Sequence, residues 1–488
     1  MSDIFLQYNK DSEYPRRGSM YHPHRLYPEY PWGETEIAQE TNDAYDMVRE
    51  CLRGLGMNAA NIDKPDWNPL GSLIKQGDTV LIKPNWVSHQ NKNPEVKDDL
   101  ECLVTHPSIV RTVFDYVSIA LAGTGKIIIA DAPMQGTDLH ALFDIAGYRE
   151  LFSFIREKNK DVIIADLRKY HVQSKNGVLS KPIETSSSAG FIRVELNNAS
   201  AHAINDNKVL RYKVSDYHSA ETKAFHAAGH HAYEINRYAL EADVIINLPK
   251  PKCHRLAGMT SAMKNFVGIV YDKASLPHRA EGDQDSSAGD AYQKHSLLKQ
   301  WMYALDDKKV AAERRGRLYA ARLANLAAKG CFCLSSKLSG DVYRIGGWYG
   351  NDTIWRTVTD LHRIITFADT AGRMQSKPQR KVLTIGDMIV CGEKDGPIGP
   401  SPKRLGAIMA SDDAVLFDRT MCSIMGFDEE NIKSLSWSVQ HQTSAEGSNK
   451  AILNSNIQQY NGKALSELNF PTEWRFEPHS CWKGHIEK

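Results

Sequence analysis

Short runs of isoleucine, valine and leucine recur along the chain, with helical patterns between them. The runs fall at residues 78–83, 126–131, 161–166 and 244–248, and the intervening helices are expected at 107–121 and 139–159. Uninterrupted apolar runs, in contrast to alternating ones, are typical of parallel strands that helices cover on both faces. The chain is therefore predicted to belong to the α/β class.

The same alternation resumes in the second half of the chain, where a helix is expected at 353–370 and strands at 381–386 and 405–410. We expect two parallel-sheet, Rossmann-like domains with a cleft between them. The predicted order is an N-terminal arm with a helix near 34–55 (1–70), a first α/β domain carrying the site (71–280), a loop with a basic helical insertion (281–340), a second α/β domain (341–430) and a C-terminal wrapping tail (431–488).

The insertion contains a basic helical run at residues 308–329, which includes the segment AAERRGRLYAARLANLAAK. We expect a solvated helix that packs on its Leu and Ala side. A membrane-surface helix or a partner-binding helix is the alternative, because basic charge beside leucines suits both.

The overall charge of the chain is close to zero, with 60 Lys and Arg against 59 Asp and Glu among 488 residues. This balance does not produce the positive field that binds nucleic acids or anionic membranes. No run approaches the roughly 20 apolar residues of a membrane span, and the polar N-terminal residues lack a signal-peptide core. We expect a cytoplasmic protein with no transmembrane segment and no nucleic-acid partner.

The cysteines and glycines exclude several cofactor classes. The eight cysteines are scattered and form no CxxC pair, so neither an iron–sulfur cluster nor a zinc knuckle is expected. No Gly-x-Gly-x-x-Gly joins a strand to a helix, which disfavours a standard nicotinamide or flavin site. The segment 123–126 is no phosphate-binding loop, because Lys126 begins a strand.

Functional side chains concentrate after the strand at 244–248, where Lys250, Lys252 and His254 follow closely. Ligands of open α/β sheets bind at the carboxyl ends of strands. The two lysines are expected to hold the anionic group of a substrate, and His254 suits reversible proton transfer near neutral pH. Lys264 comes ten residues later and is expected to act as a charge clamp or, if desolvated, as a nucleophile.

Polar residues also follow the earlier strands. Lys83 and Asn85 leave the first strand at a proline, and Asp131 ends the second strand, where doubly wound folds place catalytic or ribose-binding carboxylates. Thr260 lies among small residues that permit close approach of a substrate or cofactor. Lys83, Asn85 and Thr260 are therefore candidates for binding the substrate anion, and Asp131 is a candidate catalytic residue.

The second half of the chain adds further candidates. Glu393 lies in a Gly/Pro loop after a strand and suits a base, a metal ligand or a ribose clamp. Arg356, in the first turn of a helix, is a candidate for binding the substrate anion. Asp412, Asp413 and Asp418 indicate either a Mg²⁺ site or helix caps.

Other histidines in the chain add one metal hypothesis and one further site candidate. His226, His230 and Glu234 have i, i+4, i+8 spacing, which on a helix would place them on one face and would suit either a metal or polar capping of the site. His278 follows Lys264 by 14 residues in a Leu-Pro-His-Arg segment and adds a second histidine near the main site.

The motifs together resemble the domain of unknown function family 362. The resemblance rests on Lys83-Pro-Asn85, Leu248-Pro-Lys-x-Lys-x-His254, Thr260-x3-Lys264-Asn265, Leu276-Pro-His278, Gly350-Asn-Asp-Thr-x-Trp-Arg356 and Glu393-x-x-Gly-Pro397. These motifs occur in order over about residues 78–430. Unlike several members of that family, the chain carries no appended ferredoxin-type cysteine cluster.

A second, more distant resemblance implies catalytic roles for individual residues. The segment His254-Arg-Leu-Ala-Gly-Met-Thr-Ser-Ala-Met-Lys264 is similar to the His-x-x-Ala-Gly-x-Ser-x-x-x-Lys segment of the nickel-pincer lactate racemases. The resemblance implies the racemase fold, with His254 as a catalytic base, Lys264 as the anchor of the pincer cofactor and His278 as the nickel ligand. The second catalytic histidine of the racemases has no counterpart near residues 131–138.

These expectations lead to three functional hypotheses. The leading one is an enzyme that racemises or epimerises a small anionic substrate, such as a hydroxy acid or a sugar acid, by proton or hydride transfer. The first alternative is a Mg²⁺-dependent phosphoryl- or nucleotide-dependent transferase that uses Glu393 and the late aspartates Asp412, Asp413 and Asp418. The second is a non-catalytic carrier or maturation factor that binds a cofactor or a metal. The oligomeric state stays open, a homo-oligomer included.

Overall fold

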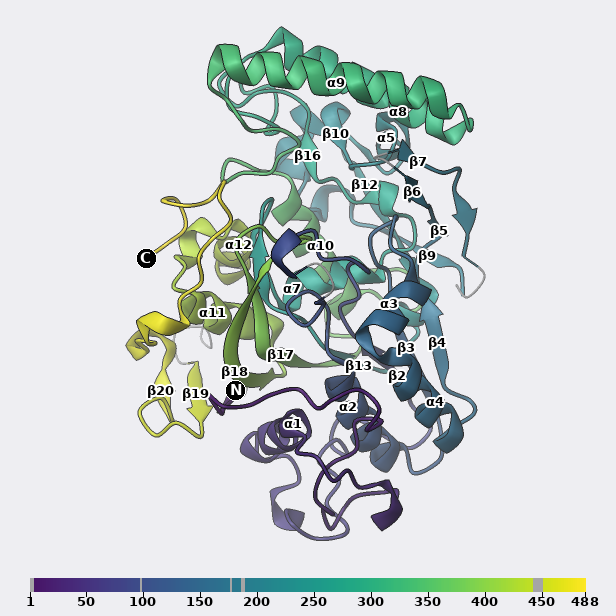
Figure 1. Ribbon diagram of the computed structural model, residues 1–488, viewed down its shortest axis with the longest axis vertical. Helices are drawn as coiled ribbons and strands as arrows, with labels where there is room; N and C mark the ends of the chain where they lie inside the picture. Colours follow the sequence, from purple (N-terminus) through teal and green to yellow (C-terminus); the bar gives the residue numbers. More distant parts are fainter. Residues whose placement is uncertain (1–3, 97–98, 176–177, 186–188, 442–450) are drawn as a thin grey trace.

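The computed structural model describes residues 4–96, 99–175, 178–185, 189–441 and 451–488. A large mixed sheet runs through the centre of the molecule (Figure 1). Within the described residues it has eleven strands, in the order β20-β19-β1-β18-β17-β13-β2-β3-β4, with β14 and β15 attached beside β17. Their bounds are Lys463–Ala464 (β20), Ile452–Ser455 (β19), Ile4–Tyr8 (β1), Ser401–Ser411 (β18), Lys381–Glu393 (β17), Val244–Asn247 (β13), Thr79–Lys83 (β2), Lys126–Asp131 (β3), Ile163–Asp166 (β4), Lys252–His254 (β14) and Gly258–Thr260 (β15).

The four strands predicted from the apolar runs are confirmed. β13, β2, β3 and β4 lie next to one another and are parallel, with Ile246 opposite Ile82 and Ile129 opposite Ile164. Because parallel strands run in one direction, their four carboxyl ends meet at the same edge of the sheet. The polar residues that follow these strands are therefore brought together in space.

Helices cover both faces of this sheet. Side chains of β2 alternate between two cores, since Leu81 belongs to one while Val80 and Ile82 belong to the other. The core with Val80 includes α1 (Asp43–Gly54), α2 (Pro107–Leu121), α3 (Leu139–Ala146) and α4 (Tyr148–Lys158), and the core with Leu81 includes α7 (Ala262–Asn265), α10 (Ile354–Phe367), α11 (Ala414–Met425) and α12 (Lys433–His441). This three-layer arrangement explains why the strands are apolar on both faces.

Helix α2 begins and ends at the predicted residues. Pro107 occupies its first position, where a missing N–H costs no helical hydrogen bond, and the His106 side chain accepts a hydrogen bond from Ser108 N. At the other end, Ala122 has a φ of 48° and its N–H donates to Ser118 O.

Two other helices differ from the prediction. The helix expected at 34–55 begins only at Asp43, because Asn42 caps it by accepting a hydrogen bond from Tyr45 N, and Glu34–Glu36 is a short 3₁₀ turn. The helix expected at 139–159 is interrupted at Gly147, whose φ of 81° ends α3 before α4 begins.

The predicted second parallel sheet is not formed. β17 pairs in parallel with β13, β18 pairs antiparallel with β17, and β1 pairs antiparallel with β18. The later strands therefore extend the sheet that the first half of the chain begins. The physical reason is that β13 would otherwise be an edge strand with unpaired N–H and C=O groups, which β17 satisfies.

The histidine-rich segment at 226–234 is a β-hairpin, and not the helix on which the metal hypothesis for His226, His230 and Glu234 depends. Gly229, with a φ of 72°, lies in the turn between β11 (His226–Ala227) and β12 (His230–Asn236). The turn places His226 and His230 on different strands, so they share no helical face. β12 also pairs with β9 (Phe191–Glu195), and the short helix α6 (Arg237–Leu240) starts only after this strand.

Smaller elements surround the sheet. α8 (Leu297–Arg314) and α9 (Leu318–Ser339) form a helical hairpin at one end of the molecule (Figure 1). The run predicted at 308–329 is therefore helical on both sides of a turn at residues 315–317, where Gly316 has a φ of 69°, and is not one continuous helix. The C-terminal segment adds β19 and β20 to the sheet edge and buries Trp474 and Trp482. Across the described parts of the chain, no helix combines the length and the apolar character that a bilayer span requires. The remaining elements are β5 (Tyr170–His171), β6 (Ser174–Lys175), β7 (Val178–Leu179), β8 (Ile183–Glu184), β10 (Tyr212–Lys213), α5 (Ser219–Lys223) and β16 (Arg279–Ala280).

Candidate active site

A cavity of about 200 Å³ lies beyond the carboxyl ends of β2 and β3. The β14–β15 hairpin, helix α7 and the loop after β10 close it. Seven residues singled out from the sequence line this cavity, namely Asn85, Asp131, Lys252, His254, Thr260, Lys264 and His278. The structure therefore brings together side chains that are up to 193 positions apart, because the parallel strands end at one edge.

Four other candidates are not among the lining residues of this cavity, namely Lys83, Lys250, Arg356 and Glu393. The charged group of each one contacts other parts of the protein, and Lys83 is the nearest to the cavity wall because its partner, Asp131, lines it. Lys83 and Asp131 form a buried ion pair in the cavity wall, with 2.7 Å between Lys83 Nζ and Asp131 Oδ1. The second oxygen of Asp131 accepts a hydrogen bond from Trp86 N at 2.7 Å. Burial lowers the pKa of Lys83, although the carboxylate opposes this shift. Both charged groups are therefore engaged with protein partners.

A glycine makes room for this ion pair. A Cβ at Gly268 would lie 2.6 Å from Lys83 Nζ and would clash with Asp131 Oδ1. Gly268 also lines the cavity, and its carbonyl accepts a hydrogen bond from Ala132 N at 2.8 Å. Its role was not predicted from the sequence, because the close approach depends on two strands that lie far from it in the chain.

Two lysines near the start of β14 have different surroundings. Lys250 Nζ lies 2.6 Å from Asp387 Oδ2 inside the core, so it is not free to bind a substrate. Lys252 Nζ donates to Asn85 Oδ1 at 3.2 Å and to the Leu103 carbonyl at 2.6 Å. Burial and the adjacent Lys250 charge lower the pKa of Lys252 to about 7. Lys252 has no carboxylate partner among the described residues, which leaves its charge available to an anion.

Three asparagines connect the segments under the cavity. Asn85 Nδ2 donates to Asn265 Oδ1 at 3.0 Å, and Asn265 Nδ2 donates to Asn247 Oδ1 at 2.8 Å. Asn247 Nδ2 in turn donates to Ala262 O at 3.2 Å. Buried networks of this kind hold side chains in one orientation when every member is satisfied. Asn247 was not predicted, because a single polar residue at the end of an apolar strand has no spacing signal.

His254 is held as a hydrogen-bond donor. Its Nδ1 accepts hydrogen bonds from Leu256 N at 3.0 Å and from Ala257 N at 3.2 Å, so this nitrogen carries no proton. Burial and the neighbouring Lys264 charge lower the pKa of His254 well below the usual range, which keeps the ring neutral. The remaining proton is therefore on Nε2, because the two ring nitrogens of a neutral imidazole have opposite roles.

His278 has the opposite tautomer. Its Nδ1 lies 2.6 Å from Leu276 O, and since a carbonyl oxygen only accepts, Nδ1 carries the proton. Burial and Lys264 lower the pKa of His278 to about 3, so its Nε2 keeps a lone pair at neutral pH. The cavity thus contains one imidazole that donates and one that accepts or ligates.

Two further lysines add to the positive lining, which also includes Arg255. Lys264, on α7, has no hydrogen-bond acceptor and no ion-pair partner among the described residues, and burial lowers its pKa to about 8. Lys273 donates to Ala132 O at 2.8 Å, and burial lowers its pKa to about 7. Lys273 was not predicted from the sequence, because it begins a short 3₁₀ helix (Lys273–Ser275) that no strand end or motif marks.

Two uncharged side chains in the lining have buried polar atoms without a partner. Neither Thr260 Oγ1 nor Gln135 Oε1 forms a hydrogen bond with any described residue. An unpaired buried group of this kind costs ~1–3 kcal/mol, and most such groups in proteins are satisfied. Together with the free amine of Lys264, these atoms indicate a polar ligand.

Asp418 positions the helix that carries Lys264. Its two oxygens accept hydrogen bonds from Ala262 N at 2.6 Å and from Met263 N at 3.0 Å, at the start of α7. Of the two interpretations of the late aspartates, capping applies to Asp418 and also to Asp413, whose side chain caps α11. The sequence could not reveal that Asp418 caps a helix more than 150 positions earlier.

Replacing Asp418 with asparagine should change how stability depends on pH. Burial raises the pKa of Asp418 from 3.8 to about 7. Between these values the folded protein retains a proton that the unfolded chain has lost, so the contribution of this carboxyl to stability falls as the pH rises from 4 to 7. Urea unfolding of the two proteins at pH 5 and pH 8 should show Asp418→Asn gaining stability relative to wild type at the higher pH. Parallel changes in the two proteins would contradict this assignment.

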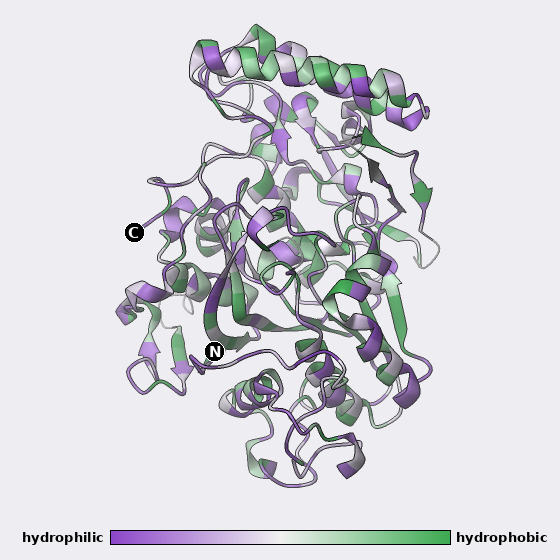
Figure 2. Ribbon diagram, viewed as in Figure 1, coloured by the Kyte–Doolittle hydropathy of each residue, from purple (hydrophilic) through white to green (hydrophobic). Residues whose placement is uncertain are grey.

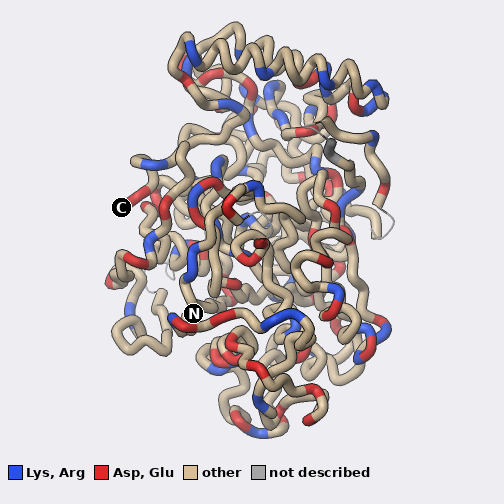
Figure 3. The backbone as a smooth tube through the Cα atoms, viewed as in Figure 1, with Lys and Arg blue, Asp and Glu red and all other residues tan. Residues whose placement is uncertain are grey.

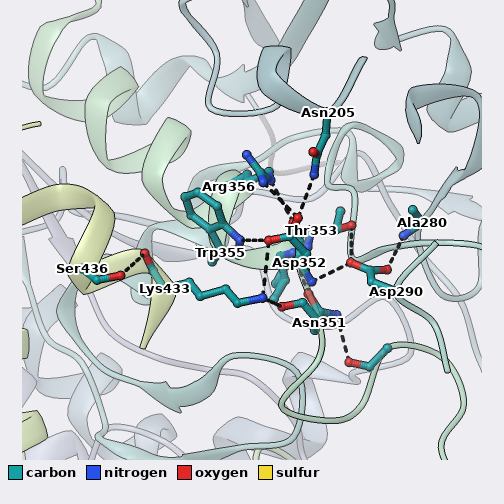
Figure 4. Close-up of polar contacts among 12 residues, drawn as sticks. Asn205, Ala280, Asp290, Asn351, Asp352, Thr353, Trp355, Arg356, Lys433 and Ser436 are labelled. Carbon is teal, nitrogen blue, oxygen red and sulfur yellow. Dashed lines mark hydrogen bonds and ion pairs between the residues drawn. The ribbon is translucent and has the colours of Figure 1, made fainter. Parts of the chain in front are cut away.

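Arg356 belongs to a polar network away from the cavity (Figure 4). Its guanidinium lies 3.0 Å from Asp352 Oδ2, and Lys433 Nζ lies 3.4 Å from the other oxygen of the same carboxylate. The network joins the start of α10 to the start of α12.

Glu393, at the end of β17, accepts a hydrogen bond from Glu477 N at 3.0 Å and so holds the C-terminal segment. Both side chains therefore serve tertiary contacts.

Across the described residues, no group of three or more His, Cys, Asp and Glu side chains is arranged to hold a metal ion. In the histidine-rich hairpin, His226 Nε2 donates to Ser275 O at 2.9 Å and His226 Nδ1 lies 3.0 Å from His231 Nδ1. Both nitrogens of His226 are therefore used in hydrogen bonds. Glu234 lies in β12, on the other side of the turn from His226 in β11.

Comparisons with known proteins place the chain in a family. It is similar to a thylakoid-associated protein of Synechocystis sp. (strain ATCC 27184 / PCC 6803 / Kazusa), with 22% identity over 218 residues that cover 45% of this chain and 47% of that protein. The chain thus matches about half the length of this curated relative. A crystal structure of a Thermotoga maritima protein matches 77% of this chain and 58% of its own, with 10% identity and a TM-score of 0.29. The family model for a domain of unknown function, DUF362, matches residues 80–189 and 197–423, well over half of the chain. The chain therefore belongs to the DUF362 family.

Proposed function

We propose that this protein is an enzyme that binds a small anionic compound, such as a hydroxy acid or a sugar acid, and racemises or epimerises it by proton transfer. The observation that carries the proposal is the unpartnered amine of Lys264 in a cavity lined by two further lysines and two neutral histidines. A general base works best when its pKa lies near the operating pH, and burial lowers the pKa of Lys264 to about 8.

Lys252 and Lys273 are suited to hold the anionic group. Their amines donate to neutral oxygens of Asn85, Leu103 and Ala132, which leaves their charges without a carboxylate counterpart among the described residues. A substrate carboxylate would supply that negative charge and would raise the pKa of both lysines. A small anion is therefore the ligand class that this lining favours.

Lys264 and His254 are suited to the chemical step. In its neutral form the Lys264 amine can accept the proton from the carbon beside the carboxylate. The C–H bonding pair then moves toward a carboxylate oxygen, where the Nε2–H of His254 can donate to the developing charge. Inversion requires that the proton return from a second group, and the Lys273 ammonium is the candidate. This assignment makes His254 a donor, whereas the racemase resemblance implied a base.

A pincer-type cofactor is the second candidate, and specific atoms favour it. The Lys264 amine and the His278 Nε2 lone pair are the two groups that would hold it, as the racemase resemblance implies. Such a group would supply a hydride acceptor when bound. In that case Lys252 and Lys273 would still bind the substrate carboxylate. Intact mass of the purified protein would show an adduct on Lys264 if this cofactor is used.

The other two hypotheses have less support from the geometry. A Mg²⁺-dependent transferase would use Glu393, but this carboxylate is bonded to Glu477 N and is not among the cavity-lining residues. A non-catalytic carrier would use the same cavity without turnover. Enzyme and carrier are separated by His254→Gln, which should retain ligand in a carrier and should lose turnover in the proposed enzyme.

Deuterium exchange tests the proposal directly. The protein is incubated in D₂O with a panel of hydroxy acids and sugar acids, and incorporation of deuterium beside the carboxylate is followed by NMR. We expect exchange into at least one substrate, with a bell-shaped pH dependence of kcat/KM that peaks between about pH 7 and pH 8. The rate should fall at lower pH because Lys264 is protonated, and at higher pH because Lys252 and Lys273, each with a pKa of about 7, lose their charge. Exchange that is independent of pH, or no exchange for any compound that binds, would overturn the proton-transfer assignment.

A further inference from the structure

The outer face of helix α9 carries a row of exposed apolar side chains. Tyr319 is 83% exposed, Leu323 is 70% exposed and Leu326 is 69% exposed. Leu334 and Leu338 continue the same side of the helix and are also exposed. These residues recur at spacings of three, four and eight, which places them on one side of a helix. We call this row of Tyr319, Leu323, Leu326, Leu334 and Leu338 the outer row.

The outer row is exposed because α9 packs on its small residues. Ala321, Ala328 and Ser335 are the buried positions of α9, and they recur every seven residues. Small side chains let α8 approach closely, and Ser335 Oγ lies 2.6 Å from Ser296 Oγ at the start of that helix. The expectation that α9 packs on its Leu and Ala side is therefore correct for the alanines and wrong for the leucines.

Charge along this segment has a single sign. Residues 314–340 contain six Lys and Arg and no Asp or Glu. Arg322, Lys329 and Lys337 lie on or beside the outer row, and none of them has an ion-pair partner among the described residues. Figure 2 shows hydrophobic and hydrophilic residues intermixed along the hairpin at the end of the molecule, and Figure 3 shows the Lys and Arg on it.

We propose that the α8–α9 hairpin docks on an anionic lipid bilayer, with α9 lying in the plane of the interface. An amphipathic helix with leucines and an aromatic on one side and only cations beside them has the composition of an interfacial helix. Leu297 and Trp301 on α8 are exposed as well and would add apolar contact. An apolar patch of this kind on a protein surface marks an interaction site.

A second copy of the chain fits the outer row less well. Face-to-face docking of two α9 helices would bring Arg322, Lys329 and Lys337 of one copy against the same cations of the other, and like charges in contact are unfavourable. Gly330 and Lys337 also interrupt the apolar row, which weakens helix–helix packing. A bilayer tolerates both interruptions, because a lysine can extend to the headgroups.

Vesicle flotation tests the proposal with the full chain. We expect co-flotation with phosphatidylcholine vesicles that contain phosphatidylglycerol, weak binding to pure phosphatidylcholine, and loss of binding at high salt. Each basic residue near an anionic surface contributes about fivefold in partitioning, so Arg322→Glu/Lys329→Glu should lower the partition coefficient by at least ~25-fold. Leu323→Ser/Leu326→Ser should reduce it to a similar or greater extent.

The matched controls are Leu210→Ser and Lys160→Glu, at exposed positions outside the hairpin, and neither should change flotation. Absence of flotation with anionic vesicles would overturn the proposal, as would equal binding to neutral vesicles. Size-exclusion chromatography with light scattering addresses the second copy. A lipid-free dimer that Leu323→Ser/Leu326→Ser converts to a monomer would assign the outer row to self-association instead.

Discussion

Lys264→Met is expected to lower the rate of deuterium exchange by ~10²–10⁴-fold, the range over which a general base contributes to catalysis. The substitution keeps the length and apolar part of the side chain, so α7 and its cap at Asp418 should remain. The methionine removes the one cavity amine that has no partner among the described residues. The expected loss is in kcat, with a smaller change in KM, because Lys252 and Lys273 still bind the anion.

A second substitution separates the two roles of Lys264. Lys264→Arg keeps the positive charge but cannot provide a neutral base below about pH 12. If Lys264 is the base, this variant should bind substrate and fail to exchange deuterium. Full activity of Lys264→Arg would show that only the charge is needed. Lys160→Met, at an exposed position, is the matched control and should retain wild-type activity.

The largest expected effect on stability comes from Asp131→Ala. The substitution leaves Lys83 fully buried without its carboxylate, and removing one member of a buried pair costs ~3–5 kcal/mol. It also removes the acceptor of the Trp86 N–H. Urea unfolding followed by circular dichroism should show the loss as a lower midpoint. The loss should shrink as the pH rises, because the buried Lys83 can then lose its proton.

Two control variants test whether the loss of stability in Asp131→Ala comes from the unpaired Lys83 charge. Lys83→Met/Asp131→Leu replaces both charges by apolar groups of similar size, and it should recover much of the loss, because a buried ion pair contributes little relative to good apolar packing. Glu241→Ala breaks the exposed Arg237–Glu241 pair and should change the free energy of unfolding by less than ~1 kcal/mol. A cost for Asp131→Ala no larger than that of Glu241→Ala would contradict the buried-pair assignment.

The parallel strands and the location of the candidate site were predictable because they depend on local signals. An apolar run such as 244–248 must be buried on both faces, and the polar residues after it must lie at the sheet edge, where ligands bind. These rules were sufficient to select Lys252, His254 and Lys264 for one cavity. They could not decide how many sheets the strands form, because pairing between β13 and β17 joins segments far apart in the chain.

Which charges are available for chemistry was decided only by the tertiary structure. Lys83 and Lys250 follow strands just as Lys252 does, yet Asp131 and Asp387 neutralise them. Carboxylates 48 and 137 positions away leave no periodic signal, since an ion pair depends on where two segments meet in space.

The sequence by itself determined the α/β class, the family and the place where the functional side chains gather, because burial and strand direction follow from local residue patterns. The folded structure showed that His254 donates and His278 accepts, because backbone groups two or three positions away set the two tautomers through a local conformation that the residue pattern does not specify. It also decided that the leucines of α9 face outward, since packing against α8 selects the smallest side chains for the contact. For the buried lysines and for α9, the deciding partner is a group far along the chain that only folding brings within reach.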